Sequence, residues 1–523
     1  MSSEPQRSNA EAYDAVPYRD FPYSFSHVRH LETMAVLFGM QPPPIDNCRV
    51  LELGCAGGGN IIPQAFDLPG SRFVAADYSP RQIEEARKSA DSLGLKNLEL
   101  RCANIMDIDD SWGTFDYIIS HGVFSWVPRP VQDKLLELSA RNLSDHGVAF
   151  VSYNTYPGWH LANIARELMC YHASHFDTPQ AKIAQAMSVL QFVCELTTGQ
   201  SAMGMFLKDE LAMLRQLDND SYLFHDHLED HNIPIYFHEF IGRAAAHGLQ
   251  YLAETDFHLM LLQNLPGKAR EALGKLPVVQ QEQYMDFVRG RRFRKTLLCH
   301  EGMPLQRMIT PERIKRFHFT VPPSLEVANV DIRDDSKAEF RTDGAKLESS
   351  DRLVKAAMMR LKEICPRYVS FQELYLTALA RLRATQPGIA GAPQAERLAE
   401  ALLTAFSVNV AQICLHPPRW AGEVRGRPVV SALARCQANR GTFVTNLRHQ
   451  AIKIGPLEQG IIHRLDGDHD RAALASELQA RVAAGEITVK HGDQVVKNPD
   501  PRLLAEVVDQ TLQFMSNHAL LVG

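Results

Sequence analysis

Short apolar runs alternate with amphipathic stretches along the first 155 residues of the chain. The apolar runs are typical of buried strands and predict five of them, at Arg49–Leu53, Arg72–Asp77, Leu98–Ala103, Phe115–Ser120 and Val148–Tyr153. A helix is predicted between the second and third runs, where apolar residues recur at helical spacing: Ile83, Ala86, Ala90 and Leu93. Strands that alternate with helices in this way predict an α/β, doubly wound sheet whose strands are mostly parallel.

The same sheet is predicted to resume after a long interruption. Ala162–Leu217 is helical in pattern, and Gln250–Ala253 and Lys295–Cys299 are apolar runs that would complete a seven-stranded sheet. The helical insertion carries more apolar positions than one flank of a sheet needs. We therefore expect it to project from the sheet and to bury these positions against a second copy of the chain, in a homodimer, or against the C-terminal half.

The length of 523 residues is too great for one ordinary core. Helices are predicted at Asp351–Ile364 and Phe371–Arg383, and Ala384–Pro393 is rich in linker residues. Leu465–Asp470, followed by a helix over Arg471–Ala484, resembles a small winged-helix unit. The expected parts are residues 1–160 (N-terminal cover and first part of the core), 161–235 (helical insertion), 236–305 (end of the core), 306–390 (an α+β middle domain) and 391–523 (an α+β, winged-helix-like C-terminal domain). We expect the C-terminal part to recognise a partner without contributing to the binding of a cofactor.

The amino-acid composition limits the kinds of partner that the chain is expected to bind. The apolar fraction of 45%, the charged fraction of 22% and the net charge of −6 are those of a soluble globular chain without a general attraction to nucleic acid. Met1–Asn9 is polar, unlike a signal peptide, and we find no run of about 18 apolar residues that predicts a membrane span. Nine cysteines without a CxxC pair predict buried thiols in a reducing compartment, hence a cytoplasmic location.

The glycine-rich loop Glu52–Asn60 directly follows the first strand and is the main chemical signal. Its glycines allow a sharp turn and let a ligand approach backbone amides. Gly54, Ala56 and Gly59 fit an altered dinucleotide fingerprint, and Gly54, Ala56 and Gly58 fit a methyltransferase loop. Glu52 favours the second interpretation, because a carboxylate repels a pyrophosphate but attracts the ammonium and sulfonium groups of S-adenosylmethionine.

Further candidates follow the later strands, where ligands of such sheets bind. Asp77 ends the second strand and could accept both ribose hydroxyls, as it also could from a dinucleotide. Asn104 follows the third strand and either accepts from the adenine amine or holds its own turn. The predicted cofactor-binding residues are Glu52, Gly54, Cys55, Ala56, Gly58, Asn60, Asp77, Tyr78, Asn104, Ile105 and His121.

Aromatic and polar side chains follow the fourth and fifth strands, at His121–Trp126 and Tyr153–Trp159, where the reacting methyl group should lie. Trp126 and Trp159 could instead pack beneath the loops. The candidates for the acceptor pocket are Tyr18, His121, Trp126, Tyr153 and Asn154.

Two acidic or histidine-rich segments and one basic run could be mistaken for other sites. The histidines at 225, 227, 231 and 238 lack an HExxH pattern, and Asp466–Asp470 lacks the glycine and distal glutamate of a calcium loop, so no metal site is predicted. The run Arg289–Lys295 is interpreted as charge at the start of a strand, with a local anionic partner as the alternative.

The motifs together resemble those of bacterial class I methyltransferases that carry a "methyltransferase regulatory domain". The similarity is carried by Tyr13–Tyr18, Leu51–Asn60, His121–Trp126, Tyr153–Trp159, Pro234–Phe240 and Asp286–Leu298, and it covers roughly residues 10–300. Ala56 departs from the family pattern, which has a second glycine there.

The rickettsial protein-lysine methyltransferases that modify an outer-membrane protein have a similar architecture. This resemblance implies S-adenosylmethionine as cofactor and a lysine of a protein substrate, which could be an outer-membrane or surface protein, as acceptor. A methyltransferase of small molecules and a cofactor-binding scaffold without methyl transfer stay open as alternatives, because the acceptor is selected by the shape of the pocket.

Overall fold

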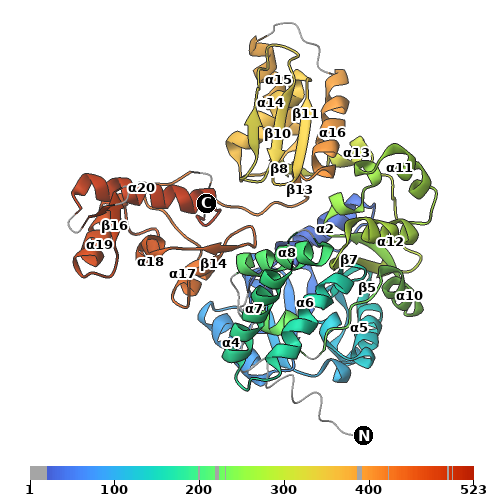
Figure 1. Cartoon of the computed structure of the whole chain (residues 1–523). Coiled ribbons are helices and arrows are strands. Elements are labelled where there is room, and N and C mark those ends of the chain that lie inside the picture. Colours follow the sequence, from blue (N-terminus) through green and yellow to red (C-terminus); the bar gives the residue numbers. More distant parts are fainter. Residues whose placement is uncertain are drawn as a thin grey trace.

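The computed structural model describes residues 21–522 apart from 198, 200, 218–222, 230, 386–391, 422, 492–493 and 497–498. Tyr18, and the Tyr13–Tyr18 motif around it, lie outside the described residues. Figure 1 shows three parts: an α/β domain that includes the N-terminal half, a middle unit in yellow and orange, and a C-terminal domain in red. Within the described residues no helix is long and apolar enough to cross a membrane.

A seven-stranded sheet in the order β3-β2-β1-β4-β5-β7-β6 forms the α/β domain, with β7 antiparallel to both of its neighbours. Its strands are β1 (Arg49–Leu53), β2 (Arg72–Asp77), β3 (Leu98–Cys102), β4 (Phe115–Ser120), β5 (Leu143–Asn154), β6 (Leu249–Glu254) and β7 (Phe293–His300). The predicted doubly wound sheet is confirmed. The central strands could be identified in the sequence because they are buried on both faces and are therefore apolar almost throughout.

Helices cover both faces of this sheet. Apolar residues of α2 (Val28–Leu37), α3 (Ile61–Asp67) and α4 (Pro80–Ser92) share one buried cluster with side chains of β1 and β2. Residues of α5 (Arg129–Arg141) and α10 (Phe237–Ala246) share the cluster on the other face. The carboxyl ends of β1, β2 and β4 remain open to ligands between these layers.

The helical insertion consists of α6 (Gly158–Ala173), α7 (Pro179–Leu196) and α8 (Ala202–Leu217). Its buried apolar residues pack mainly on one another, including Met169 of α6, Leu190 of α7 and Leu211 of α8. The prediction that the insertion projects from the sheet and packs on the C-terminal half is therefore wrong, whereas its packing against a second copy of the chain stays a prediction. The helices lie across the α/β domain (Figure 1), and α6 and α8 contribute side chains to the cavity described below.

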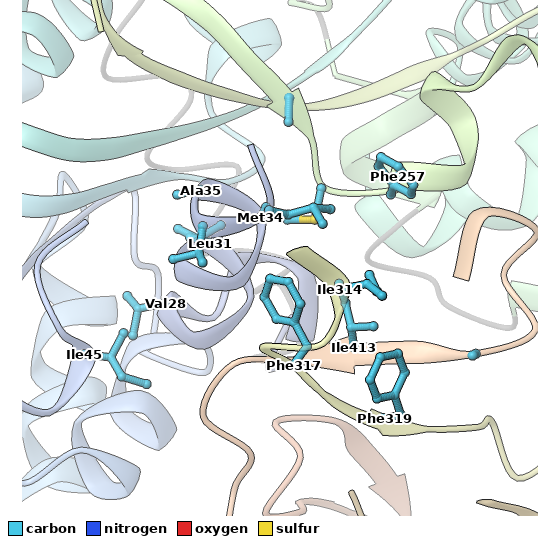
Figure 2. Close-up of a cluster of buried hydrophobic side chains, with 14 of the residues drawn as sticks. Val28, Leu31, Met34, Ala35, Ile45, Phe257, Ile314, Phe317, Phe319 and Ile413 are labelled. Carbon is cyan, nitrogen blue, oxygen red and sulfur yellow. The ribbon is translucent and has the colours of Figure 1, made fainter. Parts of the chain in front are cut away.

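The middle unit is attached through α2, whose apolar side chains extend towards it. Figure 2 shows Leu31 and Met34 of α2 close to Ile314, Phe317 and Ile413, so one continuous core connects the two units. The unit contains α13 (Pro311–Ile314), β8 (His318–Thr320), β9 (Glu326–Ala328), β10 (Ala338–Thr342), β11 (Ala345–Ser349), α14 (Arg352–Ile364), β12 (Val369–Ser370), α15 (Phe371–Thr385), α16 (Ala392–Ser407) and β13 (Gln412–Cys414).

The expected boundary between residues 390 and 391 is wrong. The helix α16 packs against α13 and α14, and β13 pairs with β8 in a three-stranded sheet, so both belong to the middle unit. Most of the predicted linker, residues 386–391, lies outside the described residues.

The C-terminal domain has a core of its own. It contains α17 (Ala432–Ala438), β14 (Phe443–Thr445), β15 (Ala451–Lys453), α18 (Pro456–Ile462), α19 (Arg471–Ala483), β16 (Val489–His491), β17 (Gln494–Val496) and α20 (Pro501–Asn517). Asp470 caps α19 by accepting from the amide of Ala473. The turn between β14 and β15, residues 446–450, reaches the α/β domain.

Candidate functional site

A cavity of about 670 Å³ lies at the carboxyl ends of β1, β2 and β4. The predicted cofactor residues that line it are Glu52, Gly54, Cys55, Ala56, Asn60, Asp77, Tyr78, Asn104, Ile105 and His121. Of the residues predicted for the acceptor pocket, His121, Trp126 and Asn154 line the same cavity. The topology thus brings together side chains that follow five different strands.

The loop after β1 follows a path that restricts its residue types. Gly54 has a φ of 74°, and a Cβ atom there would lie 2.4 Å from Cγ2 of Val123. The amides of Gly54 and Cys55 both donate to the carbonyl of Ala76, which fixes the loop to the end of β2. Ala56 has a φ of 47°, in the left-handed region that a non-glycine residue adopts at a cost.

Gly58 does not line the cavity, which corrects its place among the predicted cofactor contacts. A Cβ atom at Gly58 would lie 2.6 Å from Ile62 Cδ1 and 3.4 Å from Ala86 Cβ. The glycine therefore allows α3 and α4 to pack closely beneath the loop.

Asp77 braces the loop as well as facing the cavity. Its Oδ2 accepts from the amide of Ala56 and its Oδ1 from the amide of Ser79, both at 2.9 Å. A carboxylate oxygen has a second acceptor site, so both oxygens can still accept from hydroxyl groups of a ligand. This arrangement supports the prediction that Asp77 binds the ribose.

Asn104 also has a local role, since its Oδ1 accepts from the amide of Met106 at 3.0 Å and caps the short helix Ile105–Asp107. This contact agrees with the alternative interpretation, in which Asn104 holds its own turn. Asn104 also lines the cavity, so its predicted contact with the adenine amine stays a proposal.

Glu52 is a carboxylate at 3% exposure in the wall of the cavity. Its Oε1 accepts from Nδ2 of Asn60 at 2.6 Å, and Asn60 is itself 6% exposed. A buried negative charge in this position fits a ligand that carries an ammonium and a sulfonium and disfavours a pyrophosphate.

His121 stands between the cofactor side and the opposite wall. Its Nδ1 is 2.9 Å from Ser152 Oγ, and its ring lies edge-on to those of Tyr23 and Phe293, with centroids at 4.1 and 6.2 Å. Burial, and to a smaller extent the charge of Lys295, lowers the pKa of His121 to about 3. The ring is therefore neutral at physiological pH and is a hydrogen-bonding contact rather than a strong base.

Tyr153 is wrong as a candidate for the acceptor pocket. It is 1% exposed, its ring stacks on Phe240 at 4.1 Å, and its hydroxyl lies 3.0 Å from Thr296 Oγ1. Successive side chains of β5 point to opposite faces, so Tyr153 enters the core while Asn154 reaches the cavity. The alternation of side chains along a strand therefore separates the two neighbouring residues.

Trp126 and Trp159 agree with both interpretations of the sequence, packing beneath the loops and lining the ligand cavity. They are 9% and 5% exposed, so each packs largely beneath the loops, and each still lines the cavity. Asn154 is held by Ser125, whose Oγ accepts from its amide, and by Asn232, whose Oδ1 accepts from its Nδ2.

The lining residues that the sequence did not predict include Phe21, Tyr23, Phe25, Glu210, Met213, Arg292 and Phe293. They come from the chain before β1, from α8 and from the start of β7. Only Arg292 and Phe293 lie in a stretch that carries the family resemblance, Asp286–Leu298, and its pattern does not mark them as lining residues. Arg292 belongs to the basic run Arg289–Lys295, for which a local anionic partner was the alternative interpretation. That partner is Glu210, whose Oε2 lies 2.7 Å from Arg292 Nη1.

The histidine-rich segment supplies one residue to the cavity, His227. Burial, followed by the charges of Arg166 and Arg292, lowers the pKa of His227 to about 4. Across the described part of the chain, no three His, Cys, Asp or Glu side chains are placed to hold a metal ion.

The sheet order with an antiparallel seventh strand, the glycine loop after β1 and the acid that ends β2 define a class I, S-adenosylmethionine-dependent methyltransferase. Three family models agree: a methyltransferase domain over residues 45–210, a predicted methyltransferase regulatory domain over 219–300, and the C-terminal winged helix domain of PKMT over 426–520.

The similarity extends over the whole chain. An uncharacterised protein of Rickettsia prowazekii, RP789, is 37% identical over 98% of this chain and 93% of its own length. The structure of PKMT2 from Rickettsia typhi in complex with AdoHcy is similar over 97% of this chain and 100% of that one, at 30% identity and a TM-score of 0.87. A second structure of PKMT2 has a TM-score of 0.88. The chain belongs to this family of methyltransferases with regulatory and winged-helix domains, and its cofactor is S-adenosylmethionine.

Proposed function

We propose that this methyltransferase transfers the methyl group of S-adenosylmethionine to the side-chain amine of a lysine in a protein substrate. The observation that carries the proposal is Glu210, a carboxylate at 1% exposure in the wall of the cavity. Its Oε2 is paired with Arg292, and its buried Oε1 has no hydrogen-bond partner among the described residues. A buried acceptor without a partner is costly, so it marks a position for a donor group of the substrate.

The surroundings of Glu210 suit an uncharged amine. Arg292 balances the charge of Glu210, so the pair orients an N–H group without strongly stabilising an ammonium. Aromatic side chains form much of the remaining wall: Tyr23, Phe25, Trp126, Trp159 and Phe293. An apolar wall lowers the pKa of a bound lysine, which is about 10.4 in water, because it disfavours the cation.

The residues of the chain have separate tasks in the reaction. The bound cofactor supplies a methyl group on a sulfonium, and a neutral thioether leaves when the amine nitrogen bonds to the methyl carbon. Glu52, Asp77 and Asn104 are placed to hold the cofactor, whereas Glu210 accepts from the amine and His121 lines the path between them. Alignment of this kind contributes up to about 7–11 kcal/mol to a transfer between two bound groups.

The names of the relatives support the same acceptor. The structures similar over the whole chain are those of PKMT2, and the C-terminal model is that of PKMT, while the sequence resembles protein-lysine methyltransferases.

The test uses methyl-labelled S-adenosylmethionine and a protein extract, followed by hydrolysis and separation of the amino acids. We expect label in methylated lysines, and Glu210→Gln should lower kcat/KM by about tenfold to a hundredfold, since a hydrogen bond to a charged group is worth roughly 1.5–3 kcal/mol. The affinity for the cofactor should stay within about twofold. Glu167→Gln is the control, because Glu167 is exposed on α6. Label confined to compounds that pass a small-cutoff filter would instead support a small-molecule acceptor.

A second variant tests the charge balance. Arg292→Met leaves the carboxylate of Glu210 unbalanced, so the lysine would be held as an ammonium and the pH–rate profile should move to higher pH. An unchanged profile would show that Glu210 does not contact the acceptor.

A further inference from the structure

One side chain of the C-terminal domain reaches the cofactor loop. Nε2 of His449 lies 2.9 Å from Oδ1 of Asn60, although the two residues are 389 positions apart in the chain. Both are buried, with exposed fractions of 6% each. Asn60 lines the cofactor cavity, whereas His449 does not line it and lies in the turn between β14 and β15.

The contacts of Asn60 fix the orientation of its amide and the tautomer of His449. The backbone amide of Tyr23 must donate, and it lies 3.1 Å from Oδ1 of Asn60, where the hydroxyl of Ser26 also lies within 3.2 Å. Nδ2 therefore points to Glu52, whose Oε1 accepts at 2.6 Å. Because Oδ1 is an acceptor, His449 carries its hydrogen on Nε2 and donates it.

The turn that carries His449 is held in a defined shape. Oδ1 of Asn446 accepts from the amides of Arg448 and Gln450, each at 2.9 Å, and His449 has a φ of 57°. Nδ2 of Asn446 donates to the carbonyl of His518, next to the end of α20, so the turn is braced by its own domain. A left-handed non-glycine residue persists where the surroundings determine it, often at a functional position.

The ring of His449 is also packed against the α/β domain. It lies edge-on to the ring of His27, with centroids 4.7 Å apart, and His27 is 3.5 Å from Asp67 of α3. Burial, followed by the charge of His27, lowers the pKa of His449, so the ring stays neutral and can serve as a single donor.

We infer that the C-terminal domain completes the cofactor pocket, with His449 as a positioning residue that acts through Asn60 on the carboxylate of Glu52. This inference differs from the expectation that the domain does not contribute to the binding of the cofactor, and the experiment below decides between the two. Docking of the domain adds the His449 donor to Oδ1 of Asn60 and so strengthens the hold on the amide that binds Glu52, which makes cofactor affinity depend on a contact outside the sheet. The inference does not depend on whether the acceptor is a lysine.

The experiment compares His449→Phe with His449→Gln in the full-length chain. Both replacements have the same unfavourable left-handed backbone, so its cost cancels between them. Phenylalanine keeps a ring against His27 but cannot donate, whereas the amide of glutamine can donate from the position of Nε2. His463→Ala, at the end of α18 in the same domain, is the control because His463 does not line the cavity.

The affinity for S-adenosylhomocysteine is measured by calorimetry, and kcat and KM for the cofactor by methyl transfer. His449→Phe should bind about fivefold to twentyfold more weakly than His449→Gln, with a raised KM and a kcat within about twofold at saturating cofactor. In an Asn60→Ala background the difference between the two His449 variants should disappear. Equal affinities of the Phe and Gln variants, or a difference that persists without Asn60, would overturn the inference.

Discussion

The two halves of the sheet build opposite sides of the same cavity in different ways. Strands β3, β2, β1 and β4 are each followed directly by the loop that faces the cofactor, so strand and binding residue lie within a few positions of each other. Strands β5, β7 and β6 form the other half, and Arg292 and Phe293 reach the cavity from the start of β7, far along the chain.

This difference shows what the regulatory-domain segment does structurally. Residues 219–300, which match that family model, contain both β6 and β7 and thus complete the sheet of the methyltransferase domain. The cofactor side therefore uses a local motif, whereas the opposite side of the cavity, where we propose that the acceptor binds, is assembled from segments that meet only in the folded chain. Variants that affect one side and not the other can test this division.

The largest expected effect is on the second half of the sheet, at Arg294. This fully buried side chain donates to Glu254, Asp286 and Glu282. Arg294→Met leaves the buried Glu254 without its ion-pair partner and leaves Asp286 and Glu282 with Arg291 alone. Loss of one partner in a buried ion pair costs about 3–5 kcal/mol. We expect the free energy of unfolding to fall by that amount.

Denaturant unfolding measures the change, with Arg270→Met as the control because Arg270 is exposed on α11 (Gly267–Gly274). If β6 and β7 complete the sheet, one transition of the α/β domain should shift as a whole. A separate early transition for residues 219–300 would contradict this.

The next largest effect is on the first half, at Asp77. Asp77→Ala removes the acceptor for the ribose and the brace on the amide of Ala56, so the affinity for S-adenosylmethionine should fall by roughly 2–4 kcal/mol. Calorimetry with the wild type and with Asp91→Ala, an exposed acid of α4, gives the reference. An affinity equal to that of the wild type would remove Asp77 from the cofactor site.

The same division explains how much the sequence could predict. The starts and ends of β1, β2 and β4 are those predicted, because buried parallel strands are continuous apolar runs that end at glycine or polar loops. Glu52, Gly54 and Asp77, which line the cavity, could be identified in the sequence because their motif is local.

What the sequence did not reveal depends on contacts between distant segments. Tyr23, Glu210, Arg292 and His449 meet the site from separate parts of the chain, and single-sequence patterns carry no signal for such pairs. The boundary near residue 390 was misplaced for a related reason, because the pairing of β13 with β8 joins segments about 90 positions apart.

An effect that is smaller at pH values just below 6.5 is expected at His121, where the two sides of the cavity meet. Its pKa in the folded chain, about 3, lies below the ordinary value of 6.5, because burial disfavours the charged ring. The unfolded chain therefore binds a proton first as the pH falls. The stabilisation by neutral His121 is complete above pH 6.5 and is lost between pH 6.5 and about 3, by up to about 1.4 kcal/mol per pH unit.

The measurement compares the free energy of unfolding of the wild type and of His121→Asn at several values of pH below 6.5. The substitution has its own cost, which does not change with pH, so the difference between the two chains should narrow as the pH falls. Two parallel curves would mean that His121 titrates normally in the folded chain.

The smallest expected effect concerns Ala56, where the local motif departs from its family pattern. A left-handed conformation costs an alanine roughly 1–2 kcal/mol, whereas glycine loses about 0.5–1 kcal/mol more backbone entropy on folding. Ala56→Gly should therefore raise the free energy of unfolding by about 0.5–1 kcal/mol. The amide that donates to Asp77 is kept, so cofactor affinity should stay within about twofold.

The control is Ala480→Gly, in the exposed interior of α19, which should lower the free energy of unfolding by about 1 kcal/mol and so has the opposite sign. A loss of stability in both variants would show that the loop does not hold Ala56 in the left-handed region.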